Sequence, residues 1–217
     1  MKLKAILFDL DGTLVDSALS IGAVLNQMRL ERNMSHLETQ KYRDWVSLGA
    51  NDLVAKSLEI AVGDVDPFLQ DFRARYASKK TATEDLFPFV RESLNALKNL
   101  RISMAICSNK PLHLCEKVLN DLDLDGYFSC VVGGSSVTRA KPSREPVDIA
   151  LSMLGYSHGD SLLIGDSTLD QGASKNSGLP FIFFSGGYND GVDLAQVAGT
   201  ISSMNELIPL IKREGWI

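Results

Sequence analysis

The sequence predicts an α/β protein with a Rossmann-like, doubly wound parallel sheet and an inserted α-helical domain. Short, continuously apolar runs alternate with segments whose apolar residues recur at helical spacing. This alternation is typical of a parallel sheet that is covered by helices on both faces. One long interval contains helical spacing but no strand-like run, and polar clusters follow several of the strand-like runs.

Five apolar runs are predicted to form the strands of the sheet. They lie at residues 5–8, 102–107, 130–132, 161–164 and 181–184. Four segments with helical spacing lie between or after them, at residues 90–100, 112–122, 144–154 and 169–176. Because one strand-like run precedes the long interval and strands alternate with helices after it, residues 1–16 and 86–217 are predicted to form one α/β core domain.

Residues 17–85 are predicted to form a separate helical cap domain. Apolar residues recur at helical spacing in Ile21, Val24, Leu25 and Met28, and similar patterns occur near residues 53–61 and 68–76. Because this insertion follows the first strand directly, we expect it to lie over the carboxyl end of the sheet, where ligands bind in such folds. A helical appendage with a purely structural role is the alternative.

Composition indicates an ordinary globular protein. The chain has 217 residues, 45% of them hydrophobic, and a net charge of −5, which gives no basic footprint for nucleic acid. Cys107, Cys115 and Cys130 lack metal-ligand spacing and are expected to be reduced thiols. Asp9 and Asp11 interrupt the first apolar run, so no signal peptide is expected, and no apolar stretch approaches the ~20 residues of a membrane span. We expect a cytoplasmic protein without a nucleic-acid or membrane partner; nothing indicates a protein partner.

The residues suited to catalysis follow the predicted strands. The clusters are Asp9-Leu10-Asp11-Gly12-Thr13, Ser108-Asn109-Lys110, Lys141-Pro142, and Gly165-Asp166-Ser167 with Asp170. Because the carboxyl ends of parallel strands face one way, we expect these clusters to converge on one crevice. Each cluster alone has an ordinary explanation as a turn or a helix N-cap. Their joint occurrence at one sheet edge indicates a catalytic site.

Four carboxylates beside one lysine would be electrostatically costly. Two carboxylates about 4 Å apart repel by about 4 kcal/mol at an effective dielectric constant of about 20. A divalent cation would offset this repulsion, and oxygen ligands alone favour Mg²⁺. A bound Mg²⁺ can recruit a phosphate oxygen, so a small phosphorylated metabolite is the expected substrate.

Each residue type suits a role in phosphoryl transfer. Asp9 supplies a nucleophilic carboxylate that would form an aspartyl-phosphate. Asp11 can protonate the leaving oxygen and later accept a proton from water. Gly12 allows close approach of the backbone, and Gly12 and Thr13 are both expected to contribute to substrate binding.

Two further residue types suit the phosphoryl group itself. Ser108 and the backbone amide of Asn109 can hold phosphate oxygens at the end of the second strand. Lys141 offers a positive charge to the phosphoryl group and to Asp9.

These motifs resemble those of the haloacid dehalogenase superfamily of phosphohydrolases. The matching residues are DLDGT at 9–13, Ser108, Lys141, and GDSTLD at 165–170. The resemblance covers nearly the whole chain. It implies a Rossmann-like core and a helical cap inserted between the first two motifs.

The resemblance also implies a set of metal ligands. The side chain of Asp9, the backbone carbonyl of Asp11 and the side chain of Asp166 would bind Mg²⁺. Asp170 would orient the metal shell or Lys141 instead of binding the metal.

Flanking residues are similar to those of phosphoglycolate phosphatases, with DLDGTLVDSA at 9–18, CSNKP at 107–111 and GYNDG at 187–191. Asp11 argues against a dehalogenase, which lacks this residue because no leaving group needs a proton. Ile21 stands where the β-phosphoglucomutase branch has a histidine. The alternatives are a phosphosugar phosphatase, such a mutase, and a non-catalytic phosphate-binding regulatory module. The last should have lost Asp9, Asp11 or Lys141, and all three are present.

Overall fold

The computed structural model describes residues 2–217, which form two compact units. The segments up to Val15 and Leu86–Ile217 make up an α/β unit, and Asp16–Asp85 make up a helical unit. The helical insertion predicted from the sequence spans residues 17–85.

The α/β unit is built on a six-stranded, all-parallel sheet, which confirms the predicted fold class. Its strands lie in the order β3-β2-β1-β4-β5-β6. Their bounds are β1 Ala5–Phe8, β2 Ser103–Cys107, β3 Cys130–Val132, β4 Ser161–Gly165, β5 Phe181–Phe184 and β6 Gly199–Ile201. The strand order reverses where β1 lies beside β4, and the carboxyl ends at such a switch point are where ligands bind in doubly wound sheets.

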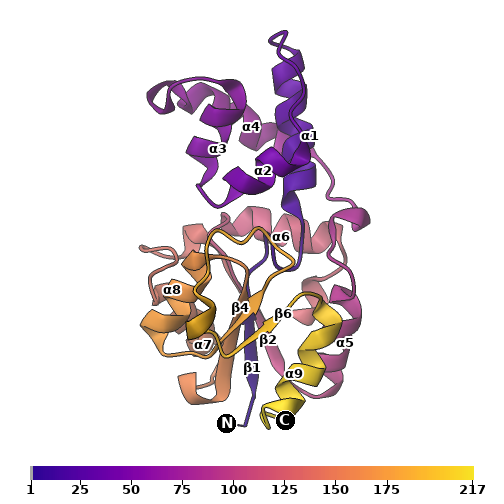
Figure 1. The fold of residues 1–217 in the computed structure, drawn as a ribbon, viewed down its shortest axis with the longest axis vertical. Coiled ribbons are helices and arrows are strands. Elements are labelled where there is room, and N and C mark those ends of the chain that lie inside the picture. Colours follow the sequence, from indigo (N-terminus) through magenta and orange to yellow (C-terminus); the bar gives the residue numbers. More distant parts are fainter. Residues whose placement is uncertain (1) are drawn as a thin grey trace. The chain divides into compact units, whose positions relative to one another are not determined.

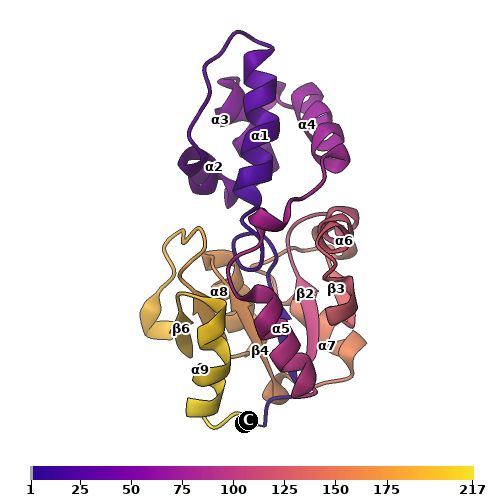
Figure 2. The same ribbon diagram turned by 90° about the vertical axis from the view of Figure 1, so that its right-hand side faces the viewer.

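Helices cover both faces of this sheet (Figures 1 and 2). Helices α5 (Val90–Asn99), α6 (Leu112–Asp121) and α9 (Leu207–Arg213) pack on one face, and α7 (Glu145–Leu154) and α8 (Thr168–Ser177) pack on the other. Successive strand residues point to opposite faces, so Ile6 and Phe8 join the first layer and Leu7 joins the second. Because both faces are buried, strands β1, β3 and β5 are apolar at every position and not at alternate ones.

The sequence did not predict two elements near the C-terminal end, strand β6 and helix α9. Strand β6 has only three residues, Gly199–Ile201, and it pairs with β5 at the edge of the sheet. Glycine is uncommon in strand interiors and Thr200 is exposed, so the segment carries little strand signal. Helix α9 follows it and contributes Leu207, Leu210 and Ile211 to the core.

The helical unit consists of α1 (Ser17–Leu30), α2 (Thr39–Val46), α3 (Ala50–Leu58) and α4 (Asp66–Ser78). Helix α1 contacts each of the other three helices. Its residues Ile21, Val24, Leu25 and Met28 are buried, as the helical spacing predicted. Within residues 2–217, no helix combines the length and the apolar character needed to cross a membrane.

A buried arginine joins α1 to two other segments of the helical unit. The Arg29 side chain is only 3% exposed. Its guanidinium donates to the carbonyl of Ser35 at 2.7 Å, to the carbonyl of Ser57 at the end of α3, and to Glu59 Oε1 at 3.1 Å. Since Arg cannot give up its charge at neutral pH, these acceptors are needed to offset its burial.

We expect Arg29→Met to destabilise the protein by about 1–3 kcal/mol, because it leaves the buried carbonyl of Ser57 and the carbonyl of Ser35 without this donor. Denaturant unfolding of the full chain, followed by circular dichroism, measures the change. Glu59→Gln is the matched control: the Glu59 side chain is 67% exposed and the two carbonyls still receive Arg29. This control should change stability by less than about 0.5 kcal/mol. Equal losses in both variants would contradict the assignment.

Candidate active site

The predicted site residues meet at the carboxyl edge of the sheet. Asp9 directly follows β1, Ser108 follows β2 and Asp166 follows β4, and these three strands are neighbours. The Asp9 backbone N–H donates to the carbonyl of Ile164 at 2.9 Å, which continues the β1–β4 pairing up to the site. Strand pairing therefore fixes the backbone beneath the reactive groups.

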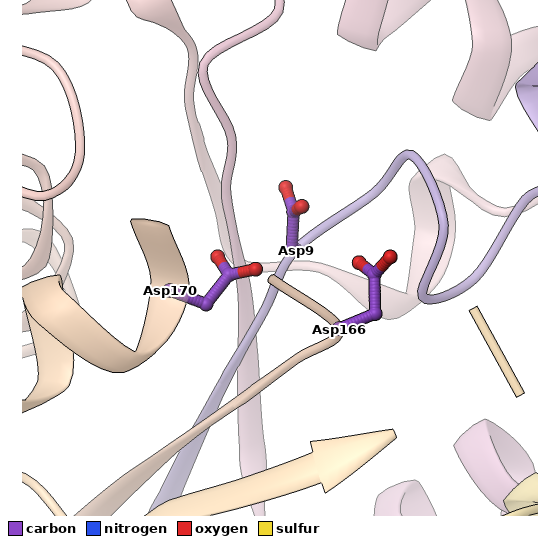
Figure 3. Close-up of side chains that lie close together, drawn as sticks. All are labelled: Asp9, Asp166 and Asp170. Atoms are coloured by element: carbon purple, nitrogen blue, oxygen red, sulfur yellow. The ribbon is translucent and has the colours of Figure 1, made fainter. Parts of the chain in front are cut away.

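Three buried carboxylates form the centre of the site (Figure 3). Asp9, Asp166 and Asp170 each offer one oxygen, and these oxygens lie within 4.8 Å of one another. In Figure 3 Asp9 lies between the other two, and the Asp170 carboxylate is turned toward it. All three residues are buried, so water screens their mutual repulsion poorly.

Lys141 is the cation at this centre. Its Nζ lies 2.5 Å from Asp170 Oδ1 and 2.9 Å from Asp9 Oδ1, and its side chain is 2% exposed. Burial by itself disfavours the charged ammonium, but the adjacent carboxylates of Asp170 and Asp9 outweigh burial and raise the pKa of Lys141 above its usual range. Lys141 is therefore charged at neutral pH.

Asn109 and Ser167 hold this ion pair in place. The Asn109 side chain bonds the Lys141 backbone twice, accepting from its N–H at 2.8 Å and donating to its carbonyl at 3.0 Å. Ser167 begins α8, and its hydroxyl donates to Asp170 Oδ2 at 2.6 Å while accepting from the Asp170 N–H at 3.3 Å. The start of the helix and the position of the lysine thus depend on the same carboxylate.

The hydrogen bonding of the three carboxylates distinguishes their roles. Both Asp170 oxygens are engaged, one by Lys141 and the other by Ser167. Asp9 Oδ1, by contrast, is buried without a hydrogen-bond donor among the described residues. The Lys141 ammonium is close enough to it for an ion pair, but the geometry is not that of a hydrogen bond. A buried oxygen in this condition suits an electrophile or a cation.

The charge state of the carboxylates follows from their burial. Burial raises the pKa of Asp9 to about 6, although Lys141 lowers it and Asp170 raises it further. Burial also raises the pKa of Asp166, with Asp170 and Asp9 adding to the effect. Without a cation these groups hold protons more readily than ordinary carboxyls do.

Two polar groups orient Asp166. The Thr13 hydroxyl donates to its Oδ1 at 3.0 Å, and the Tyr188 backbone N–H donates to its Oδ2 at 2.8 Å. Thr13 was expected to contribute to substrate binding; the structure places it fully buried behind Asp166. Gly12 has φ +84°, and a Cβ there would lie 2.2 Å from Asp166 Oδ2. Its lack of a side chain is therefore required by the backbone angle and by the space.

A second lysine reaches the site from the loop after β2. Lys110 Nζ lies 2.9 and 3.0 Å from the two carboxylate oxygens of Asp11, and its side chain is 6% exposed. Four carboxylates, including Asp11, then face two ammonium groups, so four minus two leaves a formal surplus of two negative charges. A divalent cation would neutralise this surplus.

The sequence prediction missed two contributions to the site. Lys110 stands in a cluster that the sequence singled out, but spacing gives no indication of where its side chain points. Gly187 and Tyr188, in a loop after β5, approach Asp166. The sequence of this loop indicated a resemblance to phosphatases but no contact with the site. Ser108, predicted to bind phosphate, lies at this edge, and its hydroxyl accepts from the Lys110 N–H at 3.3 Å.

Comparison with known proteins gives a consistent result. Residues 6–184 match the family model of haloacid dehalogenase-like hydrolases. The chain is 33% identical over 215 residues to a phosphoglycolate phosphatase of Pseudomonas syringae pv. syringae (strain B728a), covering 95% of this chain and 79% of that protein. It is also 33% identical over 198 residues to one of Photorhabdus laumondii subsp. laumondii, covering 89% and 85%.

A solved structure agrees over nearly the whole chain. The crystal structure of a protein from Haemophilus somnus, described as a predicted phosphoglycolate phosphatase, superposes with a TM-score of 0.83 at 25% identity. The match covers 97% of this chain and 98% of that one. The likeness therefore includes both units.

We expect Gly187→Ala to destabilise the α/β unit by about 1–3 kcal/mol, since overpacking forces the backbone to shift. A Cβ at Gly187 would lie 2.1 Å from the Gly12 carbonyl oxygen and 2.5 Å from Asp166 Cβ. Denaturant unfolding measures the effect. Gly159→Ala is the control, because its nearest neighbour would be a serine hydroxyl at 3.9 Å. A Gly187→Ala protein as stable as this control would contradict the close packing.

Proposed function

The chain belongs to the haloacid dehalogenase-like hydrolases and is a phosphatase, and we propose that it hydrolyses a small phosphate monoester through an aspartyl-phosphate on Asp9. The observation that carries the proposal is the condition of Asp9 itself. Its carboxylate is buried at the switch point of the sheet and lies beside the Lys141 ammonium, and one of its oxygens receives no hydrogen bond from residues 2–217. Asp11, which can exchange protons, lies two residues away.

In the first proposed step, an Asp9 carboxylate oxygen attacks phosphorus. The bond between phosphorus and the ester oxygen breaks, and Asp11 donates its proton to that oxygen, which leaves as an alcohol. Lys141 stabilises the negative charge of the phosphoryl group, and the strand-end residues Ser108 and Asn109 offer a hydroxyl and a backbone amide to its oxygens.

In the second step, water attacks the phosphorus of the aspartyl-phosphate. Asp11, now ionised, accepts a proton from this water as the new oxygen–phosphorus bond forms. The bond to Asp9 breaks, inorganic phosphate leaves, and the Asp9 carboxylate is restored. Each proton that Asp11 gives up in the first step is recovered in the second.

The donor set fits Mg²⁺. The surplus of two negative charges, the buried Asp9 oxygen without a donor, and an all-oxygen environment are the conditions that a hard divalent ion satisfies. Asp9, the Asp11 backbone carbonyl and Asp166 would hold the ion, while Asp170 is occupied by Lys141 and Ser167. When bound, Mg²⁺ would reduce the repulsion between the phosphate and the carboxylates and polarise the phosphorus.

We propose 2-phosphoglycolate as the first substrate to test, because the relatives reported above carry the name phosphoglycolate phosphatase. Ile21 is an apolar, buried residue of α1 and cannot transfer protons, which favours hydrolysis over a mutase reaction. Conversion of glucose 1-phosphate into glucose 6-phosphate would instead support the mutase.

We expect Asp9→Asn to lower kcat for 2-phosphoglycolate and for p-nitrophenyl phosphate by about 10³-fold or more, because the amide is a poor nucleophile. Phosphate release in the presence of Mg²⁺ measures the rate. Asp125→Asn, which removes the same charge from an exposed position, should retain full activity. Equal rates in the wild type and Asp9→Asn would exclude the aspartyl-phosphate mechanism.

We expect the stabilisation by Mg²⁺ to increase as the pH rises through about 6. The pKa of Asp9 is raised on folding, so the stability that its proton contributes is present below the unfolded pKa of about 4 and is lost above about 6. Mg²⁺ must displace this proton at low pH, which weakens binding by about tenfold, or ~1.4 kcal/mol, one pH unit below the pKa.

Thermal unfolding with and without MgCl₂, near pH 5 and near pH 7.5, tests this expectation. At a hundredfold excess of Mg²⁺ over Kd the gain should be about 2.7 kcal/mol at the higher pH and about half of that at the lower. The Asp166→Asn variant should lose most of the stability gain from Mg²⁺ at both pH values. A gain that is independent of pH would show that Mg²⁺ does not compete with the Asp9 proton.

A further inference from the structure

One cation of the site has no part in the phosphoryl chemistry described above. Lys141 faces the nucleophile Asp9, where the phosphoryl group is held. Lys110 instead contacts Asp11, the residue that exchanges a proton with the leaving group. Its charge is therefore on the leaving-group side of the reaction.

The backbone of Lys110 is held on several sides. Its N–H donates to the Ser108 hydroxyl at 3.3 Å. Its carbonyl accepts from the Gly134 N–H at 2.8 Å and from the Cys115 thiol at 3.4 Å. Because the backbone is fixed and the side chain is nearly buried, the ammonium has a defined position and is not a mobile surface charge.

The position of Asp11 fixes how near the leaving group comes to this ammonium. To protonate the ester oxygen, Asp11 must lie within hydrogen-bond distance of it, about 2.6–3.2 Å. Lys110 Nζ is a further 2.9–3.0 Å from the Asp11 oxygens. The ammonium is therefore at most about two hydrogen-bond lengths from the ester oxygen.

A substituent on the ester carbon is close enough to the ester oxygen to reach this ammonium. A carboxylate at this position is separated from the ester oxygen by a single carbon atom. Without the Lys110 ammonium it would meet only the negative charges of Asp9, Asp11 and Asp166. A neutral substituent gains nothing comparable from an ammonium, because charge-assisted hydrogen bonds are about twice as strong as neutral ones.

We infer that Lys110 is a specificity-determining residue that selects phosphate esters with a carboxylate on the carbon next to the ester oxygen. This inference rests on the proposed function and extends it from one compound to a substrate class, of which 2-phosphoglycolate is the smallest member. The Lys110 ammonium binds the substrate carboxylate while Asp11 protonates the ester oxygen.

The alternative is that Lys110 only positions Asp11. A positioning residue affects every ester equally, since every leaving oxygen needs the same proton. A residue that binds the carboxylate changes the ratio between charged and neutral esters. The ratio of kcat/KM for an ester with the carboxylate to kcat/KM for a neutral ester therefore distinguishes the two roles. A displacement of Asp11 would lower both values by the same factor and leave their ratio unchanged.

The test compares 2-phosphoglycolate with 2-hydroxyethyl phosphate, which has a neutral hydroxymethyl group in place of the carboxylate. The wild type should prefer 2-phosphoglycolate, and Lys110→Met should reduce that preference by about thirtyfold or more. Lys110→Arg, which keeps the charge, should retain most of the preference. Lys117→Met is the matched control, because Lys117 forms an ion pair with Asp121 on α6; the ratio for this variant should equal that of the wild type.

Ground-state binding gives a second measurement. Competitive inhibition by 3-phosphonopropionate, compared with propylphosphonate, should show the same loss of preference in Lys110→Met. An unchanged ratio for the esters in Lys110→Met would overturn the inference while leaving the proposed phosphatase intact. A wild type that hydrolyses neither ester nor p-nitrophenyl phosphate would overturn the proposed function, and this inference with it.

Discussion

The pairing of one buried ammonium with two carboxylates is the interaction on which the site depends. Lys141 lies between Asp9 and Asp170, and without it the repulsion among the buried carboxylates would be uncompensated. Removing one partner of a buried ion pair typically costs about 3–5 kcal/mol, because a charge is left unpaired. The same ammonium lies beside the proposed nucleophile Asp9, so we propose that one charge serves both folding and catalysis.

Much of the surrounding structure keeps that ammonium in place. Asn109 holds the backbone of Lys141 from the end of β2, and Ser167 holds Asp170 from the start of α8. Gly165 leaves the space that Asp170 occupies, since a Cβ there would lie 2.3 Å from the Asp170 carboxyl carbon. Residues that look like ordinary turn and cap formers thus define the geometry of the charged groups.

The sequence was sufficient to predict the parts that follow from local patterns. Strands β1, β3 and β5 have the predicted bounds, because a buried parallel strand is apolar throughout. Strand β6 was missed because three edge residues carry no such pattern. The parallel arrangement of the strands also explains why the sequence alone assigns the polar clusters to one edge of the sheet.

What the sequence could not supply was side-chain direction and contacts made through loops. Nothing in the spacing of Ser108, Asn109 and Lys110 indicates that the asparagine turns to the Lys141 backbone while the lysine turns to Asp11. The support that Tyr188 gives to Asp166 depends on how a loop folds back over Gly12, and such packing is not periodic. Both are tertiary effects that involve residues far apart in the chain.

That separation has a consequence for how the enzyme is made. Thr13 and Asp166, which touch in the finished site, are 153 positions apart. Because synthesis proceeds from the N-terminus, the DLDGT segment is produced long before β4 and α8 leave the ribosome. The carboxylates of the candidate site cannot come together until those elements are available, so a nascent chain that ends before them cannot assemble this site.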